Sequence, residues 1–154
     1  MAFLLRPATV DDAEFLFRLR TDPDVVAASS TLGPPDLNHH IVWLIKTITL
    51  EDRMLWVVTD EAGASIGQVR VDICDGGTHA EVSIALVRAA RGKGLGTGIL
   101  REVARRAKEE YRLGWLEAVI KEGNTASRRA FLNAGYTVEE IKDGLVHVAK
   151  YLAQ

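Results

Sequence analysis

Apolar residues recur at helical spacing in four segments of the chain, and proline or glycine separates these segments from their neighbours. The clearest helix is expected from about residue 94 to residue 111, with apolar positions on one face and charged positions on the other. Its apolar face comprises Ile99, Leu100, Val103, Ala104 and Ala107. Further helices are expected from Thr9 or Asp11 to about Arg20, after Pro34-Pro35-Asp36, and over residues 125–134. In the helix after Asp36, the apolar stripe comprises Leu37, Ile41, Leu44, Ile45 and Ile48.

Seven other segments have the alternating or continuous apolar pattern of strands. They are residues 3–6, 55–59, 65–74, 79–87, 115–120, 136–141 and 145–151. Asp75-Gly76-Gly77 and Asp143-Gly144 are typical of tight hairpin turns between such strands. Because hairpins precede a strand–helix–strand crossover, the order predicts an α/β (α+β) fold: a mixed, largely antiparallel sheet of about seven strands, with four helices on its two faces.

The composition narrows the function classes. The chain has 154 residues, 47% of them hydrophobic and 26% charged, which predicts a single domain over residues 1–154. A formal net charge of −2 argues against nucleic acid as a partner, because phosphate binding relies on a basic excess. The single cysteine, Cys74, excludes an intrachain disulfide and a cysteine-based zinc cluster. No apolar run has the length of a membrane span or of a secretory signal, so we expect a cytoplasmic protein with no membrane partner. We also expect no bound metal.

A glycine-rich turn, Arg91-Gly92-Lys93-Gly94-Leu95-Gly96, joins an expected strand to the long helix. Glycines let backbone N–H groups approach a ligand, and the helix start adds unpaired N–H donors and a positive dipole end. The turn therefore predicts an anion site suited to a diphosphate. A Walker A loop is excluded because Gly94 follows Lys93, and a dinucleotide fingerprint is excluded because Ile99 stands where glycine or alanine is required. The alternative is a tight turn that binds no ligand.

At these residues the chain resembles the GNAT superfamily of acyl-CoA N-acyltransferases. The family signature Arg/Gln-x-x-Gly-x-Gly/Ala is met by Arg91, Gly94 and Gly96. A second family pattern, Asn-x-x-Ser/Ala-x-x-x-Tyr/Phe-x-x-x-Gly-Phe/Tyr, is met by Asn124, Ser127, Phe131, Gly135 and Tyr136. The two segments stand in the family's order, and the expected strands and helices match its fold, so the resemblance covers essentially the whole chain.

The resemblance implies acetyl-CoA as the acyl donor. Its pyrophosphate would bind the N–H groups of residues 91–97, and its pantetheine arm would pair with the backbone of Leu86 and Arg88, beside a splay in the sheet. Asn124 and Ser127 would line the arm from the other side. The cofactor-binding residues implied are Leu86, Val87, Arg88, Arg91, Gly92, Lys93, Gly94, Leu95, Gly96, Thr97, Asn124, Ser127 and Phe131. As alternatives, Asn124 caps a helix and Phe131 packs in the core.

Transfer to an amine needs a proton acceptor, because an alkylamine is mostly protonated at neutral pH. Glu81 resembles by position the general base of many family members; the alternative is a solvated acid near the Gly76-Gly77 turn. Many members protonate the leaving thiolate with a tyrosine, but Phe131 stands at that position here. Tyr136 stands at a structural aromatic position. Because a CoA thiol is a tolerable leaving group, we expect direct transfer without a general acid.

The acceptor is expected to bind near the first two helices and the hairpin strands. His40 and Trp43 share a helix face, and Arg70 lies on a polar strand face. In these features the chain resembles GNAT enzymes that acetylate nucleotide-linked deoxyaminosugars, which implies a diphosphate contact for Arg70 and stacking on Trp43. The alternatives are packing roles for His40 and Trp43, and a structural ion pair of Arg70 with Asp72 or Glu81.

Two other functions stay open. In the first, the protein is still an N-acetyltransferase, but the acceptor amine belongs to a protein N-terminus or to an amino acid. A non-catalytic acyl-CoA-binding module is favoured by the missing tyrosine, whereas the intact glycine turn and Glu81 favour an enzyme. The expected partner is a small-molecule amine, and a homodimer is one option for the assembly.

Overall fold

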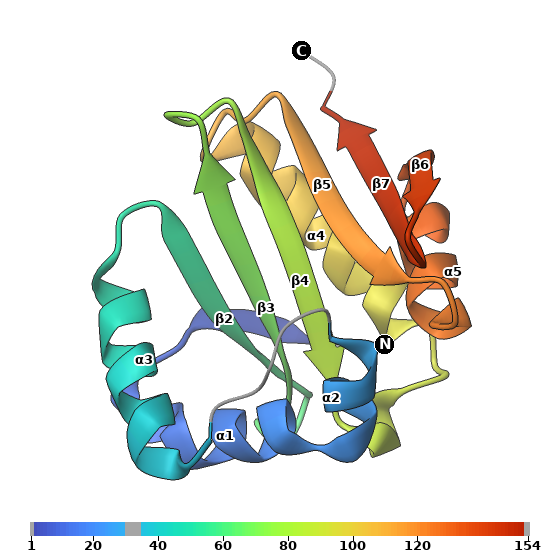
Figure 1. Ribbon diagram of the computed structural model, residues 1–154. Coiled ribbons are helices and arrows are strands. Elements are labelled where there is room, and N and C mark those ends of the chain that lie inside the picture. Colours follow the sequence, from blue (N-terminus) through green and yellow to red (C-terminus); the bar gives the residue numbers. More distant parts are fainter. Residues whose placement is uncertain (1, 30–34, 153–154) are drawn as a thin grey trace. The chain divides into compact units, whose positions relative to one another are not determined.

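The computed structural model describes residues 2–29 and 35–152, whose helices and strands are labelled in Figure 1. The chain divides into two compact units. Unit 1 comprises Met1–Val71 and Ser83–Ala90, and unit 2 comprises Asp72–Val82 and Arg91–Gln154. Both units contain part of the hairpin formed by β3 (Ser65–Cys74) and β4 (His79–Leu86). The single domain expected from the sequence stays a prediction.

Unit 1 packs three helices with the N-terminal strands. Strands β1 and β2 are antiparallel, from Leu4 opposite Thr59 to Pro7 opposite Trp56. The elements complete within this unit are β1 (Leu4–Pro7), the 3-10 turn η1 (Val10–Asp12), α1 (Ala13–Thr21), α2 (Pro23–Ala28), α3 (Leu37–Thr49), β2 (Arg53–Thr59) and the 3-10 turn η2 (Arg88–Ala90). The buried core comprises Ala8, Ala13, Leu16, Leu44, Leu55 and Val57, with Phe15, Ile41 and Trp43 packed against it.

Helix α2 is not among the helices expected from the sequence, which predicts only that the first helix ends at about Arg20. Asp22 Oδ1 accepts hydrogen bonds from the backbone N–H groups of Asp24 and Val25 at 2.9 and 3.3 Å, so it caps a new helix. Pro23 stands in the first turn, where its missing N–H leaves no bond unmade. The same two residues therefore end α1 and begin α2, and residues 2–29 and 35–152 form five α-helices where four were expected.

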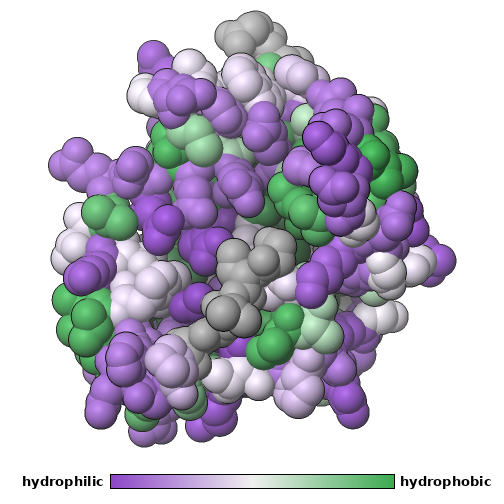
Figure 2. Space-filling view, viewed as in Figure 1, coloured by the Kyte–Doolittle hydropathy of each residue, from purple (hydrophilic) through white to green (hydrophobic). Residues whose placement is uncertain are grey.

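The apolar stripe expected on α3 is correct only in part. Leu44 is fully buried, but Ile45 and Ile48 are 45% and 37% exposed. Figure 2 shows an apolar strip at its lower left, where Figure 1 shows α3. The buried face consists of His40, Leu44 and Thr47, which follow the i, i+4, i+7 spacing of one helix face. Two of these residues are polar, so a pattern of apolar positions could not reveal them. Asp36 caps this helix as expected, while Pro34 lies outside the described residues.

Unit 2 packs α4 (Leu95–Glu109) along β5 (Trp115–Lys121), with α5 (Thr125–Asn133) beside α4 (Figure 1). The exposed face of α4 is linked by ion pairs from Arg105 to Glu102 and Glu109 at 2.8 and 2.7 Å. Strands β6 (Thr137–Lys142) and β7 (Leu145–Tyr151) form the closing antiparallel hairpin. The buried face of α4 is the predicted set extended by one residue: Leu95, Ile99, Leu100, Val103, Ala104 and Ala107.

The seven strands are hydrogen-bonded in the order β1-β2-β3-β4-β5-β7-β6, which confirms the mixed α/β fold. Strands β4 and β5 are parallel, and their register pairs run from His79 opposite Trp115 to Glu81 opposite Glu117. Strand bounds agree with the predicted ones to within two residues. Among the described residues, none of the helices combines the length and the apolar character needed to cross a membrane.

An ion pair joins β1 to the first helical turn. The Arg6 guanidinium donates to both carboxylate oxygens of Asp12 at 2.7 and 2.8 Å, and the backbone N–H of Thr9 donates to Asp12 Oδ2 at 2.8 Å. The Asp12 side chain is only 8% exposed. The bond to Arg6 holds the pKa of Asp12 below its usual value. This one carboxylate therefore satisfies two partners and fixes the angle between the strand and the helix.

We expect Asp12→Ala to lower the free energy of unfolding by roughly 1–3 kcal/mol, because the Thr9 N–H and the Arg6 guanidinium both lose their acceptor. Urea unfolding at neutral pH measures the change. Asp11→Ala, at the exposed neighbouring position, is the matched control and should change stability by less than about 0.5 kcal/mol. Equal losses in both variants would contradict the role given to Asp12.

Candidate active site

The predicted glycine turn forms the start of α4 in unit 2. Gly94 is the N-cap residue in the left-handed conformation, with φ 77°, and no side chain caps the helix. Gly92 also has a positive φ, of 72°. By contrast, Asp36 and Asn124 cap the starts of α3 and α5 with side-chain oxygens. The first backbone N–H groups of α4 are therefore left to other acceptors, as the sequence predicts.

The glycines of the turn have two different physical roles. A methyl group added at Gly92 or Gly94 would meet no atom within 4 Å, so the backbone there faces open space. A methyl group at Gly96 would lie 3.4 Å from the Cβ of Ala130, in ordinary contact, so this glycine faces α5 and not open space. Lys93 is exposed between the two open glycines. The turn thus combines bare backbone, a helix start and a cation.

The last residues of β4 differ slightly from the prediction. The strand ends at Leu86, one residue earlier than expected, and the N–H of Val87 donates to the carbonyl of Ile66 on β3 at 2.9 Å. Arg88 begins the turn η2, and its guanidinium binds Asp24 Oδ2 on α2 at 3.0 Å. Because backbone groups alternate along an antiparallel strand, Val87 points its backbone toward β3 and Leu86 points its own the other way. Because the Arg88 side chain is paired with Asp24, the contact with pantetheine expected for Arg88 is assigned to its backbone.

Gly67 on β3 was not singled out from the sequence, although an isolated glycine inside a strand is the usual signal of close backbone approach. A methyl group at this position would lie 2.6 Å from the carbonyl oxygen of Ala85 and 2.6 Å from Leu86 Cδ2. No side chain fits there without movement of β4. Gly67 therefore lets the end of β4 lie close against β3. This end includes Leu86, whose backbone is expected to pair with pantetheine.

The candidate base, Glu81, is exposed on β4, while its neighbours Ala80 and Val82 are buried. This alternation is that of a strand with one buried face. Glu81 stands in register with Glu117 of β5, and residues in register on parallel strands point to the same face. The Glu117 carboxylate accepts a hydrogen bond from Trp115 Nε1 at 2.8 Å. Glu117 is a neighbour that sequence reasoning missed, because the register of two strands separated by a helix has no local signal.

The second family segment forms α5 and the residues that follow it. Asn124 Oδ1 accepts from the N–H of Ser127 at 3.2 Å, which confirms Asn124 as the helix cap. Phe131 is 2% exposed and packs edge-on against Tyr136, with ring centroids 4.9 Å apart. Burial raises the pKa of Tyr136, and its hydroxyl has no partner within the described part of the chain. The geometry of Phe131 matches core packing, and its contact with a donor stays a prediction.

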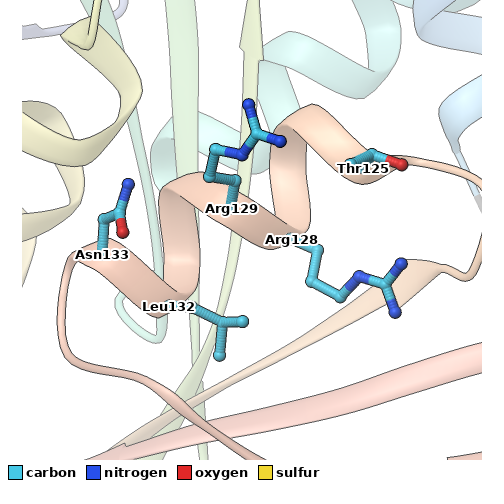
Figure 3. Close-up of a pocket in the computed structure, with 5 residues that line it drawn as sticks. All are labelled: Thr125, Arg128, Arg129, Leu132 and Asn133. Carbon is cyan, nitrogen blue, oxygen red and sulfur yellow. The ribbon is translucent and has the colours of Figure 1, made fainter.

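Helix α5 also carries a shallow hollow on its outer face. Figure 3 shows Arg128 and Leu132 pointing to one side of the helix and Arg129 to the other. Asn124 and Ser127 are not among the residues that line it, which are Thr125, Arg128, Arg129, Leu132 and Asn133. This hollow is therefore separate from the residues expected to line the pantetheine arm.

The expected acceptor residues of unit 1 include a stacked pair. The rings of His40 and Trp43 are 5.4 Å apart with an angle of 26° between their planes. His40 has no exposed surface, and neither ring nitrogen has a hydrogen-bond partner among the described residues. The Arg20 guanidinium lies over the other ring, 3.9 Å from the Trp43 centroid. Arg20 was missed at the sequence level, and His40 supports Trp43 from within the core.

Comparisons with known proteins place these features in a family. A model of the acetyltransferase (GNAT) domain matches residues 2–137 of the chain. The protein belongs to the GNAT acetyltransferases. No curated protein sequence matches this GNAT acetyltransferase. Among its described residues, no group of three or more histidine, cysteine, aspartate and glutamate side chains could hold a metal ion.

Solved structures share the fold of this GNAT acetyltransferase at low sequence identity. A spermidine N-acetyltransferase from Vibrio cholerae, in complex with CoA and spermine, has a TM-score of 0.89 and 15% identity, over 97% of this chain and 95% of that one. The structure of AAC(6')-Ib in complex with paromomycin and acetyl-CoA has a TM-score of 0.83 and 16% identity, over 98% of this chain and 94% of that one. Both likenesses extend over nearly the whole fold.

Burial, followed by the charge of Arg20, lowers the pKa of His40 to about 4, from an ordinary value of 6.5. Between these two values the unfolded chain binds a proton that the folded chain does not, so the free energy of unfolding falls as the pH drops through this window. Between pH 7 and 4.5 we expect His40 to contribute a loss of roughly 1–3 kcal/mol. Urea unfolding of His40→Phe should lack this part of the pH dependence, whereas His39→Gln, exposed on the same helix, should keep it. An unchanged pH dependence in His40→Phe would assign the acid sensitivity to other groups.

Proposed function

We propose that this GNAT acetyltransferase transfers an acetyl group from acetyl-CoA to a primary amine. The observation that carries the proposal is the uncapped start of α4, formed by the family's glycine turn. Backbone N–H donors at the positive end of a helix suit the pyrophosphate of CoA. The two related structures hold CoA or acetyl-CoA, which supports the same donor here. The proposal includes no metal, and the cytoplasmic location and the homodimer stay predictions.

The donor site is proposed from three stretches of the chain. Residues 91–97 bind the pyrophosphate through their backbone, with the charge of Lys93 nearby. The backbone of Leu86 and Arg88, on either side of Val87, pairs with the pantetheine arm. The arm is lined by Asn124, Ser127 and Phe131. In this arrangement the Oδ1 of Asn124 caps α5, and its amide N–H₂ serves the donor.

The proposed chemistry is direct transfer within a complex of enzyme, donor and acceptor. The neutral amine nitrogen attacks the thioester carbonyl carbon, and Glu81 takes the proton that the nitrogen loses, either directly or through a water molecule. Backbone N–H groups polarise the carbonyl oxygen as negative charge develops on it. The carbon–sulfur bond then breaks, and CoA leaves as the thiolate. No tyrosine stands at position 131 to protonate it, and a thiol with a pKa near 8.5 is a tolerable leaving group.

For the acceptor we propose a nucleotide-linked aminosugar, recognised by Arg70 and by Trp43 with His40 behind it. A guanidinium suits a diphosphate, and an indole ring suits stacking on a sugar or a base. The spermine and paromomycin in the related structures are polyamines and carry positive charge. A nucleotide-linked aminosugar differs from them because its diphosphate is negatively charged. An amino acid or a protein N-terminus is the second candidate acceptor, because its carboxylate or peptide also suits Arg70.

We expect Gly94→Asp to abolish detectable CoA binding, because the new carboxylate would stand where the pyrophosphate binds. Calorimetric titration with CoA measures this. The matched control is Gly144→Asp in the β6–β7 turn, since Gly144 has the same φ of 77° and the same open surroundings, and so the same backbone strain. CoA affinity equal to that of the parent protein in Gly94→Asp would overturn the donor site.

We expect Glu81→Gln to lower kcat by about 10²- to 10⁴-fold without changing the affinity for CoA. Release of the CoA thiol with a panel of amines, measured against pH, gives both the rate and the pH profile. The matched control is Glu140→Gln, an exposed position on the edge strand β6. Turnover near that of the parent protein in Glu81→Gln would give Glu81 a structural role. Thiol release by no amine in the parent protein would favour a non-catalytic acyl-CoA-binding module.

A further inference from the structure

Ordered side chains lie beside the candidate base on the adjacent strands β4 and β5 of unit 2 (Figure 1). His79 stands in register with Trp115, and Glu81 stands in register with Glu117. Residues two apart in a strand share a face, and residues in register on parallel strands point the same way. The residues between them on both strands are buried on the other face. The register therefore brings an imidazole, an indole and two carboxylates to one face of the sheet.

The Glu117 carboxylate is held in one orientation. Trp115 Nε1 donates a hydrogen bond to Glu117 Oε1 at 2.8 Å, and Glu117 Oε2 lies 3.9 Å from His79 Nε2. Trp115 is itself fixed by His79, whose ring stacks on the indole with the centroids 4.4 Å apart and 3° between the planes. On the side of β7, the Tyr151 ring lies 6.1 Å from that of Trp115. One oxygen of Glu117 is thus occupied by the indole, and the other faces the imidazole.

His79 has a different neighbour at each of its ring nitrogens. Nε2 faces Glu117, whereas Nδ1 lies 2.8 Å from Thr78 Oγ1 and 4.0 Å from Asp75 Oδ2. The His79 side chain is 11% exposed, and Thr78 and Asp75 are exposed in the turn between β3 and β4. An imidazole can take a proton at one nitrogen and release a proton from the other. His79 therefore connects the Glu117 carboxylate to the exposed turn.

The proposed reaction removes two protons from the acceptor nitrogen. An alkylamine arrives mostly as the ammonium R–NH₃⁺, and the product is the amide R–NH–CO–CH₃. One proton leaves before the nitrogen attacks the thioester, and the second leaves as the tetrahedral intermediate collapses and the carbon–sulfur bond breaks. CoA departs as the thiolate and carries neither proton. Because a carboxylate holds one proton, Glu81 has to pass the first proton on before it takes the second.

We propose that Glu117 and His79 form a proton relay that restores the Glu81 carboxylate within each turnover. The proton moves from Glu81 to the Glu117 carboxylate, directly or through a water molecule, and then to Nε2 of His79. Nδ1 of His79 gives its own proton to the Thr78 hydroxyl, which releases one to solvent. Glu117 and His79 act through Glu81 and do not touch the substrate, so they are positioning residues. The relay rests on the proposed function, because it begins at the proposed base.

Other titratable groups surround the relay in the described part of the chain. They are Cys74 of β3, Asp75 of the following turn, Glu81 of β4, and His147 and Tyr151 of β7. Burial raises the pKa of Cys74, and the hydrogen bond to Glu139 raises the pKa of Tyr151, so both stay protonated at neutral pH. Neither can accept a proton from Glu81. Glu117 and His79 are instead the groups that the structure joins in line.

Two variants remove the relay and keep its packing. Glu117→Gln still accepts the hydrogen bond from Trp115 but cannot take a proton, and His79→Phe keeps a ring against the indole without its nitrogens. With the best acceptor of the amine panel, we expect kcat of each variant to fall about 10- to 100-fold at pH 7. The loss should shrink to about 3-fold or less near pH 9.5, where more of the acceptor arrives neutral and one proton fewer is relayed. The ratio of parent to variant kcat is measured against pH, and calorimetry should show unchanged affinity for CoA.

The matched control is His147→Phe, because His147 lies on the same face of the sheet and has no ion pair with a carboxylate among the described residues. It should keep the pH profile of the parent protein. Added imidazole should raise kcat of His79→Ala but not of His79→Phe, whose ring fills the space beside Trp115. A loss of equal size at every pH, or kcat equal to that of the parent in both relay variants, would overturn the relay and leave the proposed function in place. A parent protein that acetylates no amine would reject the proposed function and the relay with it.

Discussion

An α-helix leaves its first backbone N–H groups without partners inside the helix, and α4 leaves them without a side-chain cap as well. The proposed donor site depends on this one constraint. A side-chain cap contributes about 1 kcal/mol to a helix, and α2, α3 and α5 all have one. Helix α4 is instead held by its continuous buried face and by the ion pairs around Arg105. Helix α4 is therefore stable without a side-chain cap, and its first backbone N–H groups can bind a ligand without loss of that stability.

Local features of the fold were predictable because their causes are local. The turn from Arg91 to Gly96, the buried face of α4 and the hairpin turns all depend on residues close together in the sequence. The Asn124 cap follows from the same kind of rule, since a side-chain oxygen reaches an N–H three residues away. These parts of the sequence therefore indicated the family and the residues expected to hold the donor.

Features that depend on packing between distant segments were not predictable. Thr47 is buried because the face of α3 that it shares with His40 and Leu44 packs against other parts of the protein. A threonine in the sequence gives no sign of such burial. Arg20 has the appearance of an ordinary surface arginine near a helix end until the structure places it over Trp43. Glu117 comes beside Glu81 only through the register of β4 and β5. For Arg20 and Glu81 the deciding contact joins residues more than twenty positions apart.

Gly67 has a consequence for how readily β4 opens. Because hydrogen is the largest side chain tolerated at this position, β3 contributes no side-chain contact there, and the pairing depends on backbone bonds such as the one from Val87 to Ile66. Glycine also regains more conformational freedom on release than any other residue. Local opening is easiest where side-chain contacts are small, so we expect the end of β4 to open more readily than the rest of this strand. Its amides should exchange with solvent sooner than those beside the buried Ala80 and Val82, and an extended ligand that pairs with this strand end would slow that exchange.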